Sequence, residues 1–209
     1  MLDGWPATSA VASDLRREFW DIGHELFKST PESFPATFVQ GDVFDDDFLS
    51  VAVDSPSHPT HPSHSLTTTP LNTITTLTPL IHRVSAIHTS HFFHLFTQAQ
   101  QLLLARRLSA LLLPKAGSII FGQHASRPIA GFRVESAPIH PDTDPGLPEA
   151  HMYCHSPESW KRMWVEDVFG PDRQVHVDAE LIEVDRREFK SKRDIKAKFW
   201  VMSWSVQLL

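Results

Sequence analysis

The feature that most constrains the fold is a repeated order of apolar run, acidic turn and helix-sized segment. Residues 9–13 form a short strand-like run that ends at Asp14, and the segment LRREFWDIGHELFKS that follows has apolar residues at helical spacing. Residues 36–40 form a second apolar run, which leads into GDVFDDDFL. This order predicts an α/β fold with a largely parallel sheet.

The middle of the chain continues the same order. Residues 84–88 predict a buried strand, residues 88–94 its exit loop, and residues 98–113 a strongly apolar helix that ends at Pro114. The run GSIIFG at residues 117–122 predicts another strand, buried on both faces of the sheet. Four strand-like runs are therefore separated by helices or by connections of helical length.

The C-terminal part departs from this order. Residues 156–169 predict a helix with Ser156 as its N-cap, and residues 175–184 and 199–208 predict an antiparallel strand pair that closes the sheet. A segment rich in Ser, Thr, Pro and His, at about residues 54–72, predicts a surface insertion. We expect a single domain over residues 1–209 that carries this insertion.

Composition excludes several classes of partner. The chain of 209 residues has a formal net charge of -6 and no basic block, which argues against nucleic acid and against an anionic membrane surface. Its one cysteine, Cys154, cannot form an internal disulfide, and the N-terminal residues do not resemble a secretion signal. We expect a cytoplasmic protein without a transmembrane segment, whose partner is a small-molecule substrate or a protein.

Candidate binding residues follow from the rule that ligands lie outside the carboxyl ends of parallel strands. The rule selects Asp14, Asp42, residues 88–94 and residues 122–124. A carboxylate at the position of Asp14 suits the two hydroxyls of a ribose. Two alternatives stay open, because Asp14 also fits the N-cap of the following helix and Asp42 also fits a turn.

The ordered blocks DLRREFWDIGHELF, GDVFDDDFL, RVSAIHTSHFFHLF and GSIIFGQH, followed by HSPESWKRMW and a closing WSVQL, resemble a known family. They are similar to fungal class I S-adenosylmethionine-dependent methyltransferases of secondary metabolism, which include the meroterpenoid-type biosynthetic group. The resemblance implies a Rossmann-like sheet, mostly parallel, with an antiparallel closing strand pair. It also implies S-adenosylmethionine as the cofactor.

Three groups of cofactor-binding residues, each placed after one strand, follow from the resemblance. They are Asp14 and Leu15 at the ribose, Asp42, Val43 and Phe44 at the adenine, and His88, Thr89 and Ser90 at the methionine part and the transferable methyl group. The acceptor substrate would lie near His91, Phe92 and His94. His91 or His94 is then the candidate catalytic base, because an imidazole accepts a proton near neutral pH.

The family also has a first strand and a GxGxG turn before the equivalent of residue 2. None of the eight glycines of this sequence has another glycine within two positions. We therefore expect an N-terminally truncated sheet that lacks the first strand and the glycine-rich loop. Three outcomes stay open: the remaining strands close up, a second chain supplies the strand in a homodimer, or the sequence is an incomplete version of a longer one.

Three functions are compatible with these features. The first is methyl transfer from S-adenosylmethionine to an oxygen of a small secondary metabolite. The second is a methyltransferase-like protein that does not bind the cofactor and acts as a scaffold, a partner subunit or a cofactor-independent catalyst. The third is a metal-dependent hydrolase that uses His88, His91 and His94, but no cluster of Cys, Asp or Glu supports a metal site, and we expect none.

Overall fold

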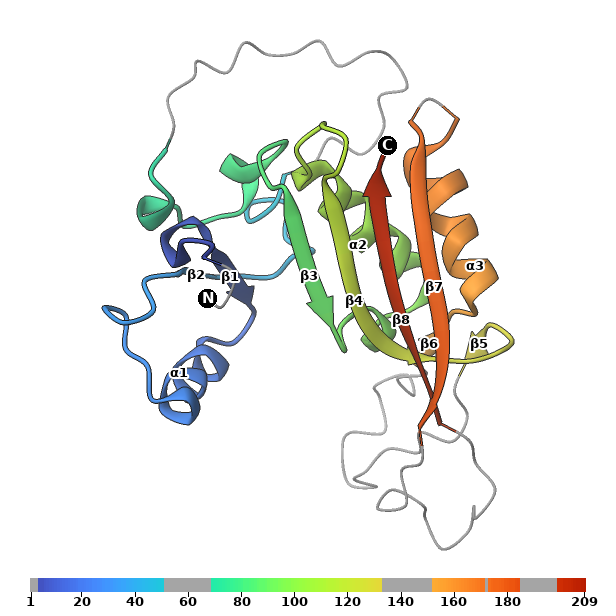
Figure 1. Cartoon of the computed structure of the whole chain (residues 1–209), viewed down its shortest axis with the longest axis horizontal. Coiled ribbons are helices and arrows are strands. Elements are labelled where there is room, and N and C mark those ends of the chain that lie inside the picture. The colour runs from blue at the N-terminus through green and yellow to red at the C-terminus, as the bar shows by residue number, and fades with distance from the viewer. Residues whose placement is uncertain (1–3, 51–68, 133–151, 172, 185–198) are drawn as a thin grey trace, which may run out of the picture. The chain divides into compact units, whose positions relative to one another are not determined.

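The computed structural model describes residues 4–50, 69–132, 152–171, 173–184 and 199–209 (Figure 1). The chain divides into two compact units, Met1–Ile81 and His82–Leu209. The single domain over residues 1–209 stays a prediction. No helix in the described ranges is both long enough and apolar enough to span a membrane.

The first unit is built around one parallel strand pair. Its described elements are β1 (Val11–Asp14), α1 (Arg17–Phe27) and β2 (Thr37–Gln40), with short 3-10 turns at Ala7–Ser9, Leu71–Thr73 and Thr78–Leu80. β1 and β2 pair in parallel with Asp14 opposite Gln40, and α1 is the connection that a parallel pair requires. The predicted order of strand, acidic turn, helix and strand is confirmed here.

The second unit contains a four-stranded sheet. Its described elements are β3 (Ala86–Ser90), a 3-10 turn (Phe93–Leu95), α2 (Gln98–Leu111), β4 (Ile119–Ser126), β5 (Gly131–Phe132), β6 (Tyr153–Cys154), α3 (Pro157–Arg162), a π-helical segment (Met163–Phe169), β7 (Val175–Val184) and β8 (Phe199–Leu208). The strand order of the sheet is β3-β4-β8-β7, as Figure 1 shows, and β5 pairs separately with β6.

Three strands of this sheet run in one direction and one is reversed. β3 is parallel to β4, whereas β8 is antiparallel both to β4 and to β7. β7 therefore runs in the same direction as β3 and β4. The predicted antiparallel closing pair is confirmed, and the chain is a mixed α/β protein. Because β8 lies between β4 and β7, the parallel ladder of this sheet is confined to β3 and β4.

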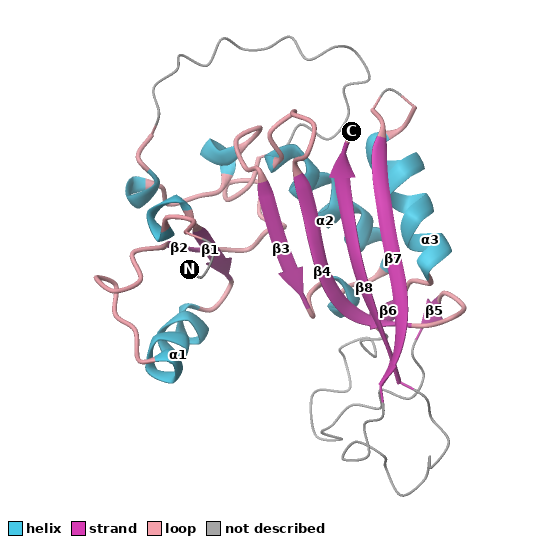
Figure 2. Cartoon of the chain, in the orientation of Figure 1, coloured by secondary structure: helices cyan, strands magenta, loops and turns pink. Residues whose placement is uncertain are grey.

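Side-chain caps fix where the two helices of this unit begin. Thr97 accepts a hydrogen bond from the backbone N–H of Gln100 and forms a capping box at the start of α2. Ser156 forms the same motif with Ser159 at the start of α3, which confirms Ser156 as the predicted N-cap. Figure 2 shows α2 and α3 on one face of the sheet.

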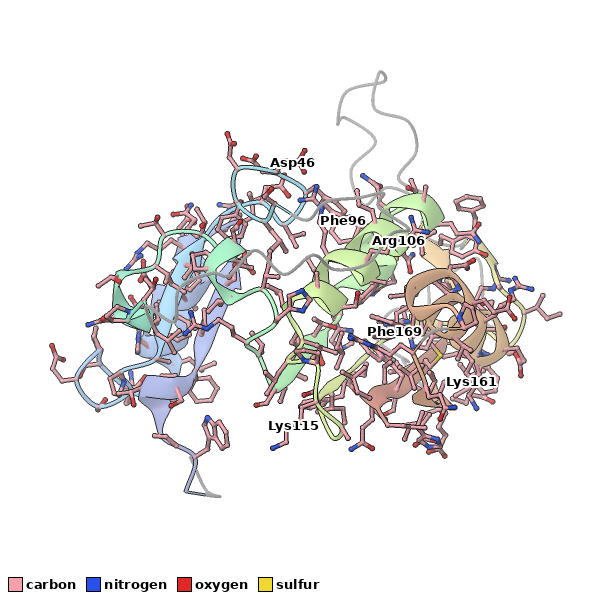
Figure 3. All side chains as sticks on the ribbon, turned by 90° about the horizontal axis from the view of Figure 1, so that it is seen from above. Asp46, Phe96, Arg106, Lys115, Lys161 and Phe169 are labelled. Carbon is pink, nitrogen blue, oxygen red and sulfur yellow. The ribbon has the colours of Figure 1, made fainter. Side chains whose placement is uncertain are left out.

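The α2 helix is tied to the segment that follows α3. Arg106 on α2, which Figure 3 labels, donates hydrogen bonds from Nε and Nη2 to the carbonyl oxygen of Asp167, at 3.3 and 3.2 Å. Phe169, at the end of the same π-helical segment, stacks on Trp164 with ring centroids 6.1 Å apart. The hydrogen bonds from Arg106 hold the π-helical segment against α2, and the Phe169–Trp164 contact lies within that segment.

The centre of the second unit is an aromatic cluster, which consists of Phe93, His124, Trp160, Trp164 and Trp204. All five side chains are at most 3% exposed. The ring of Trp160 lies 4.9 Å from Phe93, 4.7 Å from His124 and 4.8 Å from Trp204, measured between centroids. The cluster joins the turn after β3 to β4, α3 and β8.

Two predicted strand ends are shifted by sheet pairing. β3 continues to Ser90 and β4 to Ser126, two and four residues past the predicted ends. The reason is that β3 pairs with β4 to its last residue and β4 pairs with β8 along its whole length. The predicted insertion at about residues 54–72 falls largely outside the described residues. Its described end carries the turn Leu71–Thr73.

Gly122 on β4 pairs with Thr89 on β3 and leaves no room for a side chain. A Cβ atom at Gly122 would overlap the carbonyl oxygen of Thr89. This oxygen belongs to the backbone and cannot rotate away as a side chain could. Replacing Gly122 by alanine is therefore expected to separate β3 from β4 and to lower the free energy of unfolding by about 1–3 kcal/mol.

Urea unfolding of the Gly122→Ala variant measures this effect. Gly131→Ala is the matched control, because a Cβ atom there meets nothing within 4 Å. The control is expected to change the free energy of unfolding by less than about 0.5 kcal/mol. Equal stability of the two variants would contradict the close approach at Gly122.

Candidate functional site

Asp14 is the last residue of β1, and its carboxylate is exposed. Its Oδ1 accepts a hydrogen bond from the backbone N–H of Arg16 at 2.8 Å. The N-cap of α1 is Arg16, and no side chain caps that helix. The alternative interpretation of Asp14 as a helix N-cap is therefore wrong, and the residue forms a turn after the strand instead. Leu15 follows with its side chain 61% exposed.

Asp42 lies two residues beyond the end of β2, and its carboxylate is also exposed. Its Oδ1 accepts a hydrogen bond from the backbone N–H of Phe44 at 2.8 Å, so the alternative interpretation of Asp42 as a turn residue is confirmed. Val43 and Phe44 are half-buried beside it. Phe48 packs directly on Gly41, which fixes the start of this turn.

The two acidic turns lie at the same edge of the first unit. The backbone N–H of Gly41 donates to the carbonyl oxygen of Asp14 at 3.1 Å, so the parallel ladder continues to the residue before Asp42. Within the described residues, Oδ2 of each carboxylate has no hydrogen-bond partner. Each carboxylate therefore retains an oxygen that can accept from a ligand, and this fits the ribose hydroxyls and the adenine amine of S-adenosylmethionine.

The group His88, Thr89 and Ser90 lies within β3, whereas the sequence placed it after the strand. Nε2 of the exposed His88 is 2.9 Å from Oγ of Ser90, and the His88 ring lies 5.1 Å from that of Phe121 on β4. Oγ1 of Thr89 is buried and has no hydrogen-bond partner among the described residues. These side chains are held by the β3–β4 pairing.

The candidate bases His91 and His94 lie beyond the carboxyl end of β3. His91 is exposed, has a φ of 52°, and donates its backbone N–H to the carbonyl oxygen of Gln123 at 2.7 Å. His94 is 7% exposed, and its ring centroid lies 6.1 Å from that of His91. A non-glycine residue in the left-handed region is uncommon and often marks a functional loop.

The structure adds two buried histidines to this region. His124 lies 6.4 Å from His94 between ring centroids, and His155 lies 5.5 Å from Trp160. Burial lowers the pKa of His124 well below its usual range, with further contributions from the charges of His94, His155 and His91. Burial, followed by the charge of Arg162, lowers the pKa of His155 to about 4. Both imidazoles are neutral at pH 7.

Sequence patterns contained partial signals for these residues. His124 ends the block GSIIFGQH, which the strand-end rule selected through residues 122–124, but β4 buries it within the sheet. His155 precedes the helix cap Ser156 and begins the block HSPESWKRMW, but sequence patterns indicated no role for it in the site. Both histidines are buried against indole rings. This burial depends on packing between segments that are distant in sequence, so local patterns do not reveal it.

The predicted site residues fall into two groups. The residues at the ribose and adenine positions belong to Met1–Ile81, and His88 to His94 belong to His82–Leu209. Among the described residues, no group of three or more His, Cys, Asp or Glu side chains is placed to hold a metal ion. The hypothesis of a metal-dependent hydrolase therefore has no site in the described ranges.

The chain is similar to a known methyltransferase. No family model matches the sequence. Over 187 residues, the chain is 27% identical to O-methyltransferase phiE of Fungal sp. (strain ATCC 74256), and the match covers 90% of this chain and 50% of that protein. The chain thus spans about half the length of the curated relative that it matches. A mixed α/β fold is compatible with this relationship.

Proposed function

We propose that this chain takes part in S-adenosylmethionine-dependent methyl transfer to an oxygen of a small secondary metabolite. The match to a fungal O-methyltransferase over 90% of the chain carries the proposal. The exposed carboxylates at the ends of two neighbouring parallel strands support it, because such strand ends are where α/β sheets bind nucleotide-like ligands.

Each group of residues has one task in this proposal. Asp14 accepts hydrogen bonds from the ribose hydroxyls, and Asp42 accepts from the adenine amine while Val43 and Phe44 cover the ring. When bound, the cofactor supplies a methyl group on a positively charged sulfur atom. His91 or His94 accepts the proton of the substrate hydroxyl or carboxyl group through a ring nitrogen. His88, Thr89 and Ser90 are assigned to the methionine part of the cofactor and its transferable methyl group.

Isothermal titration calorimetry with S-adenosylhomocysteine tests cofactor binding without turnover. Asp14→Asn removes the charge that strengthens the hydrogen bonds to the ribose. A hydrogen bond to a charged group contributes about 1.5–3 kcal/mol, so the variant is expected to bind about 10- to 100-fold more weakly.

Asp47→Asn is the matched control for this titration, because Asp47 is an exposed carboxylate in the same unit that does not end a strand. The control is expected to bind as the wild type does. If the wild type shows no binding at millimolar ligand, the proposal is contradicted for this chain. That result would favour the methyltransferase-like protein that acts without the cofactor.

A further inference from the structure

His124 is held by one specific hydrogen bond inside the aromatic cluster. The indole Nε1–H of Trp204 donates to Nδ1 of His124 at 3.0 Å, and the two side chains are 3% and 1% exposed. The bond joins β4 to β8, whose pairing places Trp204 opposite Gly122. It therefore crosses between neighbouring strands in the most buried part of the second unit.

This bond determines which nitrogen of His124 carries the proton. An indole N–H can only donate, so Nδ1 must offer its lone pair, and the proton of the neutral ring lies on Nε2. Protonation of Nδ1 would place two donors face to face and break the bond. Burial also opposes the charged form, and it lowers the pKa of His124. His124 is thus a neutral imidazole with a fixed tautomer.

His124 also lies directly beside the loop that carries the candidate bases. Its neighbour Gln123 accepts the backbone N–H of His91 at 2.7 Å. The ring of His124 lies 6.4 Å from that of His94 and 6.0 Å from that of Phe93, between centroids. The turn Phe93–Leu95 therefore packs on the His124 ring, while His91 is fixed to the backbone next to it.

We propose that Trp204 and His124 form a positioning pair for the substrate end of the site. Trp204 locks His124 in the neutral Nε2–H tautomer, and the locked ring holds the loop of His91 and His94 at the carboxyl end of β3. His124 itself does not contact the substrate, because its side chain is fully buried. This role rests on the proposed methyl transfer, but the tautomer and the loop position can be measured without it.

Nitrogen-15 NMR of the histidine side chains tests the lock in the cofactor-free protein. Wild-type His124 is expected to show the Nε2–H pattern at pH 7 and to remain neutral at pH 6, where an ordinary histidine is mostly charged. Trp204→Phe removes the hydrogen-bond donor, and His124 is then expected to populate both neutral tautomers. Trp164→Phe is the matched control, because the Trp164 indole lies in the same cluster and makes no hydrogen bond to His124.

The positioning role is tested by the NMR signals of His91 and His94 and by enzyme kinetics. Trp204→Phe and His124→Leu are expected to shift the His91 and His94 signals. His124→Asn is expected to retain them, because its Oδ1 lies near the Nδ1 position and can accept from Trp204. In an active enzyme, kcat should fall about 10-fold in the first two variants, with KM and the affinity for S-adenosylhomocysteine unchanged.

Two results would overturn this inference. One is a wild-type His124 that carries its proton on Nδ1 or is charged at pH 6. The other is a Trp204→Phe variant whose His91 and His94 signals match those of the wild type. Failure of the proposed function gives a different pattern, in which the NMR results hold and the protein does not bind S-adenosylhomocysteine.

Discussion

Replacing Trp160 by alanine is expected to lower the free energy of unfolding of the His82–Leu209 unit by about 3–5 kcal/mol. The Trp160 side chain is fully buried and contacts rings from four other segments: Phe93, His124, His155 and Trp204. Its removal takes away a large apolar surface and leaves a cavity among rigid rings, which cannot move in to fill it.

Urea unfolding, followed by tryptophan fluorescence and circular dichroism, measures this loss. Trp5→Ala is the matched control, because Trp5 is 56% exposed. The control is expected to change the free energy of unfolding by less than about 0.5 kcal/mol. A Trp160→Ala variant as stable as the control would contradict the aromatic cluster as the centre of this unit.

Acid is expected to destabilise the same unit between about pH 6.5 and pH 4. The pKa of His155 is about 4 in the folded chain and 6.5 in the unfolded chain, so the unfolded state binds more protons in this window. Stability is therefore full above pH 6.5 and falls as the pH is lowered towards 4. At 1.36 kcal/mol per pKa unit, the protonation of His155 alone lowers the free energy of unfolding by about 3 kcal/mol. His124 acts in the same direction, because its pKa is also lowered.

Urea unfolding at pH 7, 6 and 5 tests this dependence above the range in which most carboxylates titrate. His155→Asn is expected to be less stable than the wild type at pH 7 and to lose less stability towards pH 5, because it has no imidazole to protonate. His176→Asn is the control, since His176 is exposed on β7 and its side chain is 59% accessible. Parallel stability curves for the wild type and His155→Asn would contradict the prediction.

Local sequence patterns predicted most of the elements. The closing strands Val175–Val184 and Phe199–Leu208 were predicted with their observed bounds, since alternating residues and a charged connection specify such a pair. The cap at Ser156 was predicted because its signal spans only a few residues. Patterns of this kind depend on neighbours in the chain, which are visible in a single sequence.

What the sequence could not predict depends on contacts between distant segments. The end of β3 at Ser90 is set by pairing with β4, and the place of β8 between β4 and β7 is a property of the whole sheet. Helical spacing predicted α1, yet Phe19, Ile22 and Phe27 on that helix are each more than half exposed. Periodicity indicates which residues share a face but not what covers it.

In the candidate site, too, local patterns selected some residues, while contacts between distant segments could not be predicted. The strand-end rule selected Asp14 and Asp42, and the structure places both at one edge of the β1–β2 pair. The same rule reached the segment that contains His124, but only the fold reveals the hydrogen bond from Trp204. The roles of the selected residues at a cofactor and at a substrate stay predictions.

The most direct test of methyl transfer is an isotope experiment. The protein is incubated with S-adenosylmethionine that carries a ¹³C-labelled methyl group and with a panel of small phenols and carboxylic acids. The carbon chemical shift and long-range couplings of the product identify the atom to which the label is bound. We expect the label on an oxygen, with transfer reduced in Asp14→Asn. Label on nitrogen or carbon alone, or transfer unaffected by Asp14→Asn, would contradict it.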